Sequence, residues 1–192
     1  MPNRLTLVLG GVRSGKSAFA EKLVRRLDLP TWYLATGQAT DAEMEDRIRR
    51  HRLSRPADWS TLEEPLKPGL ALMSALGGTG LPTELPRAVL VDSLDTWVSN
   101  LLLRHESRTG PELESLVMSQ VDQLLQAGRH PSTSVVMVSS EVGLSLVPPN
   151  ELGRRFLDLQ GLVNQRVAAA ADQVYLIVAG IPVEIKNGPG SP

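Results

Sequence analysis

The eight residues from Gly10 to Ser17, GGVRSGKS, match the pattern G-x-x-x-x-G-K-[ST]. They follow a short run rich in β-forming residues, Arg4–Leu9, and precede a helix-compatible stretch from Gly15 to Leu27. A glycine-rich loop between a buried strand and a helix cradles phosphate groups with its backbone N–H groups, and a chance match would lack this context. The sequence therefore predicts a nucleotide-binding loop, and an α/β fold to carry it.

The residues of this loop have distinct predicted roles. We expect Lys16 to bridge phosphate oxygens and the hydroxyl of Ser17 to bind Mg²⁺. The start of the following helix adds partial positive charge. The backbone around the phosphates is expected to come from Gly10, Gly11, Val12, Arg13, Ser14 and Gly15.

Five apolar, β-rich runs predict parallel strands at Arg4–Leu9, Trp32–Thr36, Ala88–Val91, Ser134–Val138 and Val174–Val178. Further helices are expected at Asp41–Leu53, at the apolar segment Thr96–Leu103, and around Phe156–Ala170, where apolar residues recur at steps of three and four. Strands that alternate with helices predict a layered, mostly parallel α/β sheet with helices on both faces, of the P-loop NTPase-like (RecA-like) class. Ile181–Lys186 is expected to add an antiparallel edge strand.

The length of 192 residues fits one domain, which we place at residues 1–186. Residues 67–86 are rich in glycine and proline and are predicted to be a loop insertion, while residues 187–192 are predicted to be a flexible tail.

Charge and cysteine content narrow the possible partners and location. A formal net charge of -1 argues against broad binding to nucleic acid or to an anionic membrane. The chain has no cysteine, and its three histidines are scattered, so a zinc site has little support. No apolar run has the length of a membrane span, and a cytoplasmic location is expected.

Asp92 follows the predicted strand Ala88–Val91, where a carboxylate reaches Mg²⁺ or its water shell in folds of this type. The alternative is that Asp92 caps the next helix, although Ser93 could equally do so. Glu141 stands at the end of another strand and could orient a substrate or cap a turn.

The residues alone slightly favour a structural role for His51 over a catalytic one. It follows Ile48 at helical spacing, which favours a packed structural histidine, and the arginines around it could pair with nearby carboxylates on a solvated helix. The same arginines could instead clamp a polyphosphate.

Several motifs together resemble the bifunctional adenosylcobinamide kinase/adenosylcobinamide-phosphate guanylyltransferase family of cobalamin biosynthesis. Beyond the phosphate loop, these are Ala35-Thr36, Asp41–Trp59 with R-I-x-x-H-x-x-x-R-P, Glu141-Val142-Gly143 with Val147-Pro148, and Asn164-Gln165-Arg166 before Ala169–Asp172. The resemblance spans nearly the whole chain, except residues 67–86.

The resemblance implies two reactions on one substrate. The first phosphorylates adenosylcobinamide from ATP or GTP, and the second transfers GMP from GTP to adenosylcobinamide phosphate. It implies that His51 carries the GMP, that Lys16 and Asp92 are catalytic, that Ser17 and Asp92 hold Mg²⁺, and that the chain is a homo-oligomer, a trimer by resemblance. Further nucleotide contacts implied by the resemblance are Ala35, Thr36, Gly37, Arg52, Leu53, Ser54, Arg55 and Glu63.

Two other hypotheses compete with this one. Another small-molecule P-loop kinase would transfer phosphate without a covalent protein intermediate. A nucleotide-dependent switch protein would bind a partner, but the Asn-Lys-x-Asp sequence that reads guanine in signalling GTPases is absent.

Overall fold

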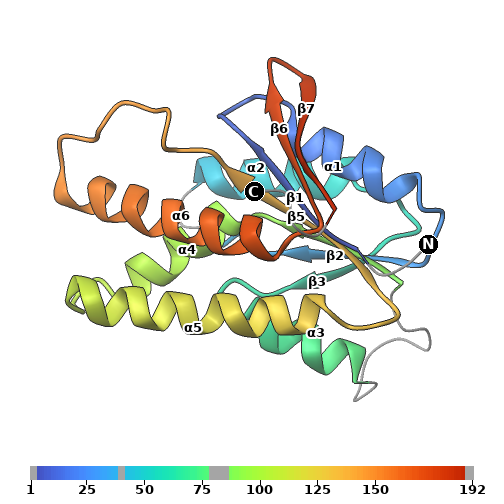
Figure 1. Cartoon of the computed structure of the whole chain (residues 1–192), viewed down its shortest axis with the longest axis horizontal. Coiled ribbons are helices and arrows are strands. Elements are labelled where there is room, and N and C mark those ends of the chain that lie inside the picture. The colour runs from blue at the N-terminus through green and yellow to red at the C-terminus, as the bar shows by residue number, and fades with distance from the viewer. Residues whose placement is uncertain (1–3, 39–41, 78–86, 189–192) are drawn as a thin grey trace.

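The computed structural model describes residues 4–38, 42–77 and 87–188, and Figure 1 shows their arrangement. The strands are β1 (Leu5–Gly10), β2 (Thr31–Ala35), β3 (Ser60–Glu63), β4 (Ala88–Asp92), β5 (Ser134–Ser140), β6 (Gln173–Val178) and β7 (Ile181–Asn187). The helices are α1 (Lys16–Arg25), α2 (Ala42–Ser54), α3 (Pro68–Leu76), α4 (Leu94–Arg104), α5 (Gly110–Gly128) and α6 (Glu151–Ala170). None of these helices is both long and apolar enough to cross a membrane.

The strands form one sheet in the order β3-β2-β4-β5-β1-β6-β7. Every neighbouring pair is parallel except β6 and β7, which are antiparallel. The predicted α/β sheet, its five parallel strands and its antiparallel edge strand are therefore confirmed. The sixth parallel strand, β3, was not predicted, because its four residues are largely exposed and lack an apolar run.

Helices cover both faces of the sheet (Figure 1). On one face, α1 buries Ala20 and Val24 against a core that includes Tyr33, Leu90 and Val138. On the other face, α3, α4, α5 and α6 bury a larger core that contains Trp97 and many aliphatic side chains. Both faces of the sheet are thus covered, as in a layered α/β fold, and the polar site residues lie at the ends of the strands.

Two boundary predictions need correction. Pro68–Leu76 is helix α3, although residues 67–86 were predicted to be a loop. Pro68 stands in the first turn, where proline is well tolerated, and Gly69 allows α3 to approach α5 so closely that a Cβ there would lie 2.7 Å from Leu124 N. Asn187, predicted to begin a tail, is the last residue of β7. Residues 78–86 of the predicted loop and 189–192 of the predicted tail lie outside the described residues.

The parallel strands all end at one edge of the sheet, and their register brings the predicted site residues to it. Ala35 of β2 pairs with Asp92 of β4, and Gly10 of β1 pairs with Ser140 of β5. This is the edge at which open α/β sheets bind ligands.

Candidate functional site

The predicted phosphate loop joins β1 to α1 in a tightly turned conformation. Arg13 and Gly15 have φ angles of 56° and 94°, in the left-handed region. Ser14 N donates to Gly11 O at 3.2 Å, and Gly180 N, from the turn between β6 and β7, donates to Ser14 O at 2.9 Å. Because a Cβ disfavours the conformation at residue 15, the sequence needs glycine there. The loop is thus braced by a neighbouring turn.

The two glycines that open the loop stand in different surroundings. A Cβ at Gly10 would lie 2.4 Å from Ser14 Oγ and 2.9 Å from Ile177 O, whereas a Cβ at Gly11 would meet nothing within 4 Å. Ser14 Oγ is itself buried and has no hydrogen-bond partner among the described residues. Since buried hydroxyl groups are normally paired, this one is suited to an oxygen of a bound anion.

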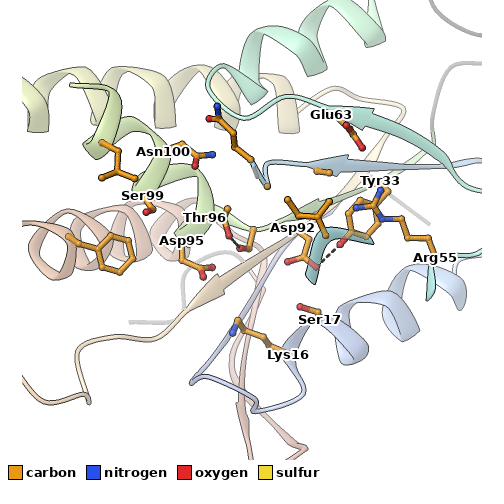
Figure 2. A pocket seen from close by; sticks show the side chains of 17 residues that line it. Lys16, Ser17, Tyr33, Arg55, Glu63, Asp92, Asp95, Thr96, Ser99 and Asn100 are labelled. Carbon is orange, nitrogen blue, oxygen red and sulfur yellow. Dashed lines mark hydrogen bonds between the residues drawn. The ribbon is translucent and has the colours of Figure 1, made fainter. Parts of the chain in front are cut away.

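A cavity of about 350 Å³ lies beside this loop (Figure 2). Lys16 and Ser17 line it from the start of α1, and Lys16 Nζ donates to Gly11 O at 3.3 Å. Seven predicted site residues line the cavity, namely Lys16, Ser17, Ala35, Gly37, Arg55, Glu63 and Asp92. The other described loop residues, Gly10 to Gly15, form the turn next to it.

Asp92, at the end of β4, receives a hydrogen bond that the sequence analysis missed. The hydroxyl of Tyr33, a buried residue of β2, donates to Asp92 Oδ2 at 2.7 Å (Figure 2). Burial raises the pKa of Tyr33 well above its usual value near 10, and the negative charge of Asp92 raises it further. Tyr33 therefore stays protonated and donates to Asp92. The alternative that Asp92 caps α4 is wrong, because the N-cap residue is Ser93.

Arg55 extends this arrangement. Its guanidinium carbon lies 4.0 Å from the centre of the Tyr33 ring, a cation–π contact, and Nη1 donates to Thr61 Oγ1 at 3.4 Å. Arg55, Tyr33 and Asp92 all line the cavity. The guanidinium of Arg55, the phenol of Tyr33 and the carboxylate of Asp92 thus form a row of contacting groups on the cavity wall. The period-two alternation of β2, which puts Tyr33 on the same face as Ala35, is the sequence signal that could have identified Tyr33.

Thr36 has a different place from the one predicted. It is fully buried, its Oγ1 donates to Ser93 O at 2.8 Å, and it accepts from Ser93 N at 3.0 Å. Asn100 Nδ2 donates to Thr36 O at 2.8 Å. These bonds tie the end of β2 to β4 and α4. Thr36 is not among the residues that line the cavity.

Two acidic groups stand near the end of β5. Asp95 lines the cavity and accepts from Ser140 N at 3.2 Å and from Ser140 Oγ at 2.9 Å. Glu141 Oε1 accepts from Gly143 N at 2.7 Å. Of the two hypotheses for Glu141, this bond favours the turn cap. Asp95 lies in the first turn of α4, three residues after Asp92. This spacing is the sequence feature that could have placed Asp95 at the site.

A cluster of buried polar side chains, Ser139, Gln160 and Asn164, holds the end of β5. Ser139 Oγ donates to Asn164 Oδ1 at 2.6 Å, and Gln160 Nε2 donates to both at 2.7 and 2.9 Å. Asn164 Nδ2 donates to Ser140 O at 2.9 Å. Asn164, from the motif Asn164-Gln165-Arg166, therefore fixes the backbone next to Asp95.

Helix α2 borders the cavity with Ile48, whose side chain lies against Gly37. Arg52 makes a two-pronged contact with Glu63, with bonds of 2.8 and 2.7 Å. Farther along, Asp46 pairs with Arg49 and Arg50, and hydrogen bonding from Arg49 lowers the pKa of Asp46. The pairs of Asp46 with Arg49 and Arg50 fit the hypothesis that the arginines of this helix pair with nearby carboxylates in solvent. The pair of Arg52 with Glu63 differs, because Glu63 lines the cavity.

The side chains of three predicted residues lie outside the described part of the structure, namely His51, Leu53 and Ser54. Their backbone belongs to α2. Cavity-lining residues that sequence reasoning did not assign to the site are Tyr33, Gln38, Ile48, Ser93, Asp95, Thr96, Ser99, Asn100, Leu103 and Phe156.

Comparisons with known proteins give matches over nearly the whole chain. Residues 6–185 match the family described as cobinamide kinase / cobinamide phosphate guanyltransferase. The bifunctional adenosylcobalamin biosynthesis protein CobP of Pseudomonas aeruginosa is 41% identical over 184 residues, 95% of this chain and 98% of that protein. The corresponding CobU of Salmonella typhimurium is 40% identical over 189 residues, 95% of this chain and 99% of that protein.

Among solved structures, the flagellar accessory protein FlaH of Methanocaldococcus jannaschii is similar with a TM-score of 0.51 and 12% identity. The match covers 99% of this chain and 82% of FlaH, and it supports the fold alone. The predicted fold class is confirmed.

Proposed function

Because the chain belongs to the cobinamide kinase / cobinamide phosphate guanyltransferase family, we propose that the cavity beside its phosphate loop serves both transfers. The chain is a transferase of cobalamin biosynthesis. In the first reaction, a nucleoside triphosphate, ATP or GTP, phosphorylates the aminopropanol hydroxyl of adenosylcobinamide. In the second, GMP passes from GTP to adenosylcobinamide phosphate, and pyrophosphate is released. The observation that carries the proposal is the convergence of Lys16, Ser17 and Asp92 on one cavity.

The donors at the cavity suit Mg²⁺. Ser17 supplies a hydroxyl and Asp92 a carboxylate, which are the hard oxygen ligands this ion prefers. The described residues contain no group of three or more histidine, cysteine or acidic side chains that could hold a metal by itself. That agrees with an ion held by one carboxylate and by the phosphates of the nucleotide. Bound there, Mg²⁺ would neutralise charge that develops on the phosphate oxygens.

In the kinase step, the chain's own groups position the triphosphate. The loop backbone from Gly10 to Gly15 surrounds the phosphates, and Lys16 offers its ammonium to their oxygens. The substrate hydroxyl attacks the γ-phosphorus and loses its proton to water, the bond from that phosphorus to the β,γ-bridging oxygen breaks, and the nucleoside diphosphate leaves. Asp92, oriented by Tyr33, holds its carboxylate toward the cavity.

In the guanylyl transfer, we assign the nucleophile to His51. A ring nitrogen attacks the α-phosphorus of GTP, the bond to the α,β-bridging oxygen breaks, and pyrophosphate leaves. A phosphate oxygen of adenosylcobinamide phosphate then attacks the same phosphorus and breaks the bond to nitrogen. Position 51 stands three residues after Ile48, which lines the cavity, and both positions belong to α2. A spacing of three places residues on one helix face, which supports the assignment.

The remaining nucleotide contacts belong to this proposal as well. Ala35, Gly37, Arg55 and Glu63 face the cavity and are assigned to the nucleotide. Arg52 contributes through its contact with Glu63. Thr36 acts by holding the strand ends, and Leu53 and Ser54 are assigned by family resemblance alone.

We further propose that the enzyme works in the cytoplasm as a homo-oligomer, a trimer by family resemblance, without nucleic acid as a partner. The nearly balanced charge of -1 supports the last point.

Incubation of the full chain with adenosylcobinamide, Mg²⁺ and GTP tests the proposal, with mass spectrometry of the small molecules and of the protein. We expect adenosylcobinamide phosphate, the GDP-linked product, and a protein mass increased by one GMP. Nucleotide hydrolysis with no corrinoid product would refute the proposal.

A further inference from the structure

The segment between β5 and α6, residues 141–150, exposes three apolar side chains that packing does not explain. Leu144, Leu146 and Val147 are 86%, 94% and 74% exposed. Figure 1 shows this segment reaching out past the sheet before it returns to α6. Apolar side chains gathered at this exposure on one short loop mark a binding surface more often than isolated ones do.

The loop is held in place by its own hydrogen bonds. Ser145 N donates to Val142 O at 3.1 Å, and Arg154 Nη1 donates to Pro149 O at 2.7 Å. Asn150 Oδ1 caps α6 by accepting from Gly153 N at 2.6 Å. The exposure of the apolar side chains is therefore a feature of a built loop.

The residues that flank the loop along the chain lead to the cavity, although none of residues 141–150 lines it. Ser140, immediately before it, is bonded to the cavity residue Asp95. Phe156, on the first turns of α6 after it, lines the cavity, as does Leu103 of α4, which is 48% exposed. The loop that bears the exposed apolar side chains therefore lies between two segments of the chain that reach the cavity.

The size of the cavity indicates what this surface receives. Pockets that enclose a small ligand measure roughly 300–1,000 Å³, and this cavity, at about 350 Å³, is at the lower end of that range. A nucleoside triphosphate fills a space of this size. The macrocycle of cobinamide must then lie outside it, with its aminopropanol arm extended to the phosphates.

We infer that Leu144, Leu146 and Val147 form the surface on which the corrin macrocycle rests, an inference that depends on the proposed function. The edge of a corrin ring carries methyl groups and methylene-linked amides, so its apolar parts match these side chains. A second copy of the chain is a less suitable occupant, because three side chains offer much less than the roughly 800 Å² per partner of a typical protein interface.

Equilibrium dialysis of adenosylcobinamide, followed by corrin absorbance, tests the inference on the full chain. We expect the variant with Leu144→Ser and Leu146→Ser to bind adenosylcobinamide at least tenfold more weakly, with unchanged affinity for GTP. The variant with Leu144→Met and Leu146→Met should bind as the wild type does. The matched control is Leu70→Ser with Met73→Ser on α3, two exposed apolar side chains away from the cavity, which should leave both affinities within twofold.

Three results would overturn the inference. One is wild-type affinity for adenosylcobinamide in the serine variant, while the wild type binds and converts it. Another is a weaker affinity that coincides with a changed elution volume in size-exclusion chromatography, because this would assign the loop to contact between copies of the chain. Failure of the wild type itself to bind or convert adenosylcobinamide would refute the proposed function, and the inference with it.

Discussion

The phenol of Tyr33 and the carboxylate of Asp92 meet across two adjacent strands, with the hydroxyl 2.7 Å from Asp92 Oδ2. The bond leaves Asp92 with one oxygen fixed by a neutral donor. A carboxylate held in this way faces the cavity in a single orientation, as the hydrogen-bond partners of metal-binding groups commonly ensure.

Removal of this donor should weaken the binding of Mg²⁺ with nucleotide. For Tyr33→Phe we expect the Mg²⁺ concentration for half-maximal GTP binding to rise by about tenfold, the lower end of the usual effect of such partners. Titration of a fluorescent GTP analogue with Mg²⁺ measures it. Tyr175→Phe, which removes the 3.4 Å contact to Glu184 at the sheet surface, is the matched control and should not shift the curve. An unshifted curve for Tyr33→Phe would separate Tyr33 from the metal.

The raised pKa of Tyr33 predicts a loss of stability at alkaline pH. A tyrosine exposed by unfolding titrates near 10, whereas burial keeps Tyr33 protonated in the folded protein. Above pH 10 the folded state therefore binds more protons than the unfolded state, so its stability falls as the pH rises, by up to about 1.4 kcal/mol per pH unit. Urea unfolding of metal-free protein between pH 9 and 11 measures this slope. Tyr33→Phe should flatten it, and an equal slope in the variant would contradict the assignment.

Lys16→Ala should impair both reactions, because one ammonium serves the phosphates in each. Loss of a single charged donor to a transition state costs roughly 10²–10³ in rate. Initial rates of phosphorylation and of GMP transfer, each assayed with its own substrate, test this. Lys22→Ala, an exposed lysine on the same helix, should retain both rates. If only one reaction slowed in Lys16→Ala, the two transfers would not share a phosphate site.

His51→Ala should separate the two activities. Without a nitrogen nucleophile, labelling of the protein by [α-³²P]GTP and formation of the GDP-linked product should vanish, while phosphorylation of adenosylcobinamide continues. His130→Ala, in the turn before β5, is the control and should label fully. Normal labelling of His51→Ala would assign the nucleophile to another residue.

Asn164→Ala should destabilise the fold through the buried polar cluster. The substitution removes the bonds from Asn164 to Ser139, Ser140 and Gln160, and of this cluster only the bond from Gln160 Nε2 to Ser139 Oγ remains. At about 1–3 kcal/mol for each unpaired group, with partial relaxation, we expect a loss of about 2–4 kcal/mol in the free energy of unfolding. Chemical denaturation measures it. The exposed neighbour Gln165→Ala should change stability by less than about 0.5 kcal/mol.

Much of the fold could be predicted because its strands are buried on both faces and so form continuous apolar runs. Helix α3 could not, since the proline and glycine that begin it are typical of loops and only its packing on α5 reveals their use. Strand β3 has no apolar pattern of its own, because it lies at the sheet edge and gains its conformation by pairing with β2.

The site was predictable where one local motif carries the chemistry, as at Lys16 and Ser17. Tyr33 and Asp95 were missed because their partners, Asp92 and Ser140, come from distant strands, 59 and 45 residues away. Thr36 was assigned to the nucleotide by family resemblance, but its hydroxyl is hydrogen-bonded to the backbone of Ser93, which only the folded structure shows.

Gly10 and Gly11 are adjacent, but their different surroundings imply that glycine is required at the two positions for different reasons, namely folding at residue 10 and phosphate binding at residue 11. At residue 10 the folded chain itself excludes a methyl group, whether or not a nucleotide is present. At residue 11 the free protein has room for one, so only an incoming phosphate would oppose it. In a mutational library sorted first for soluble expression and then for catalysis, alanine should disappear at residue 10 in the first sort and at residue 11 in the second.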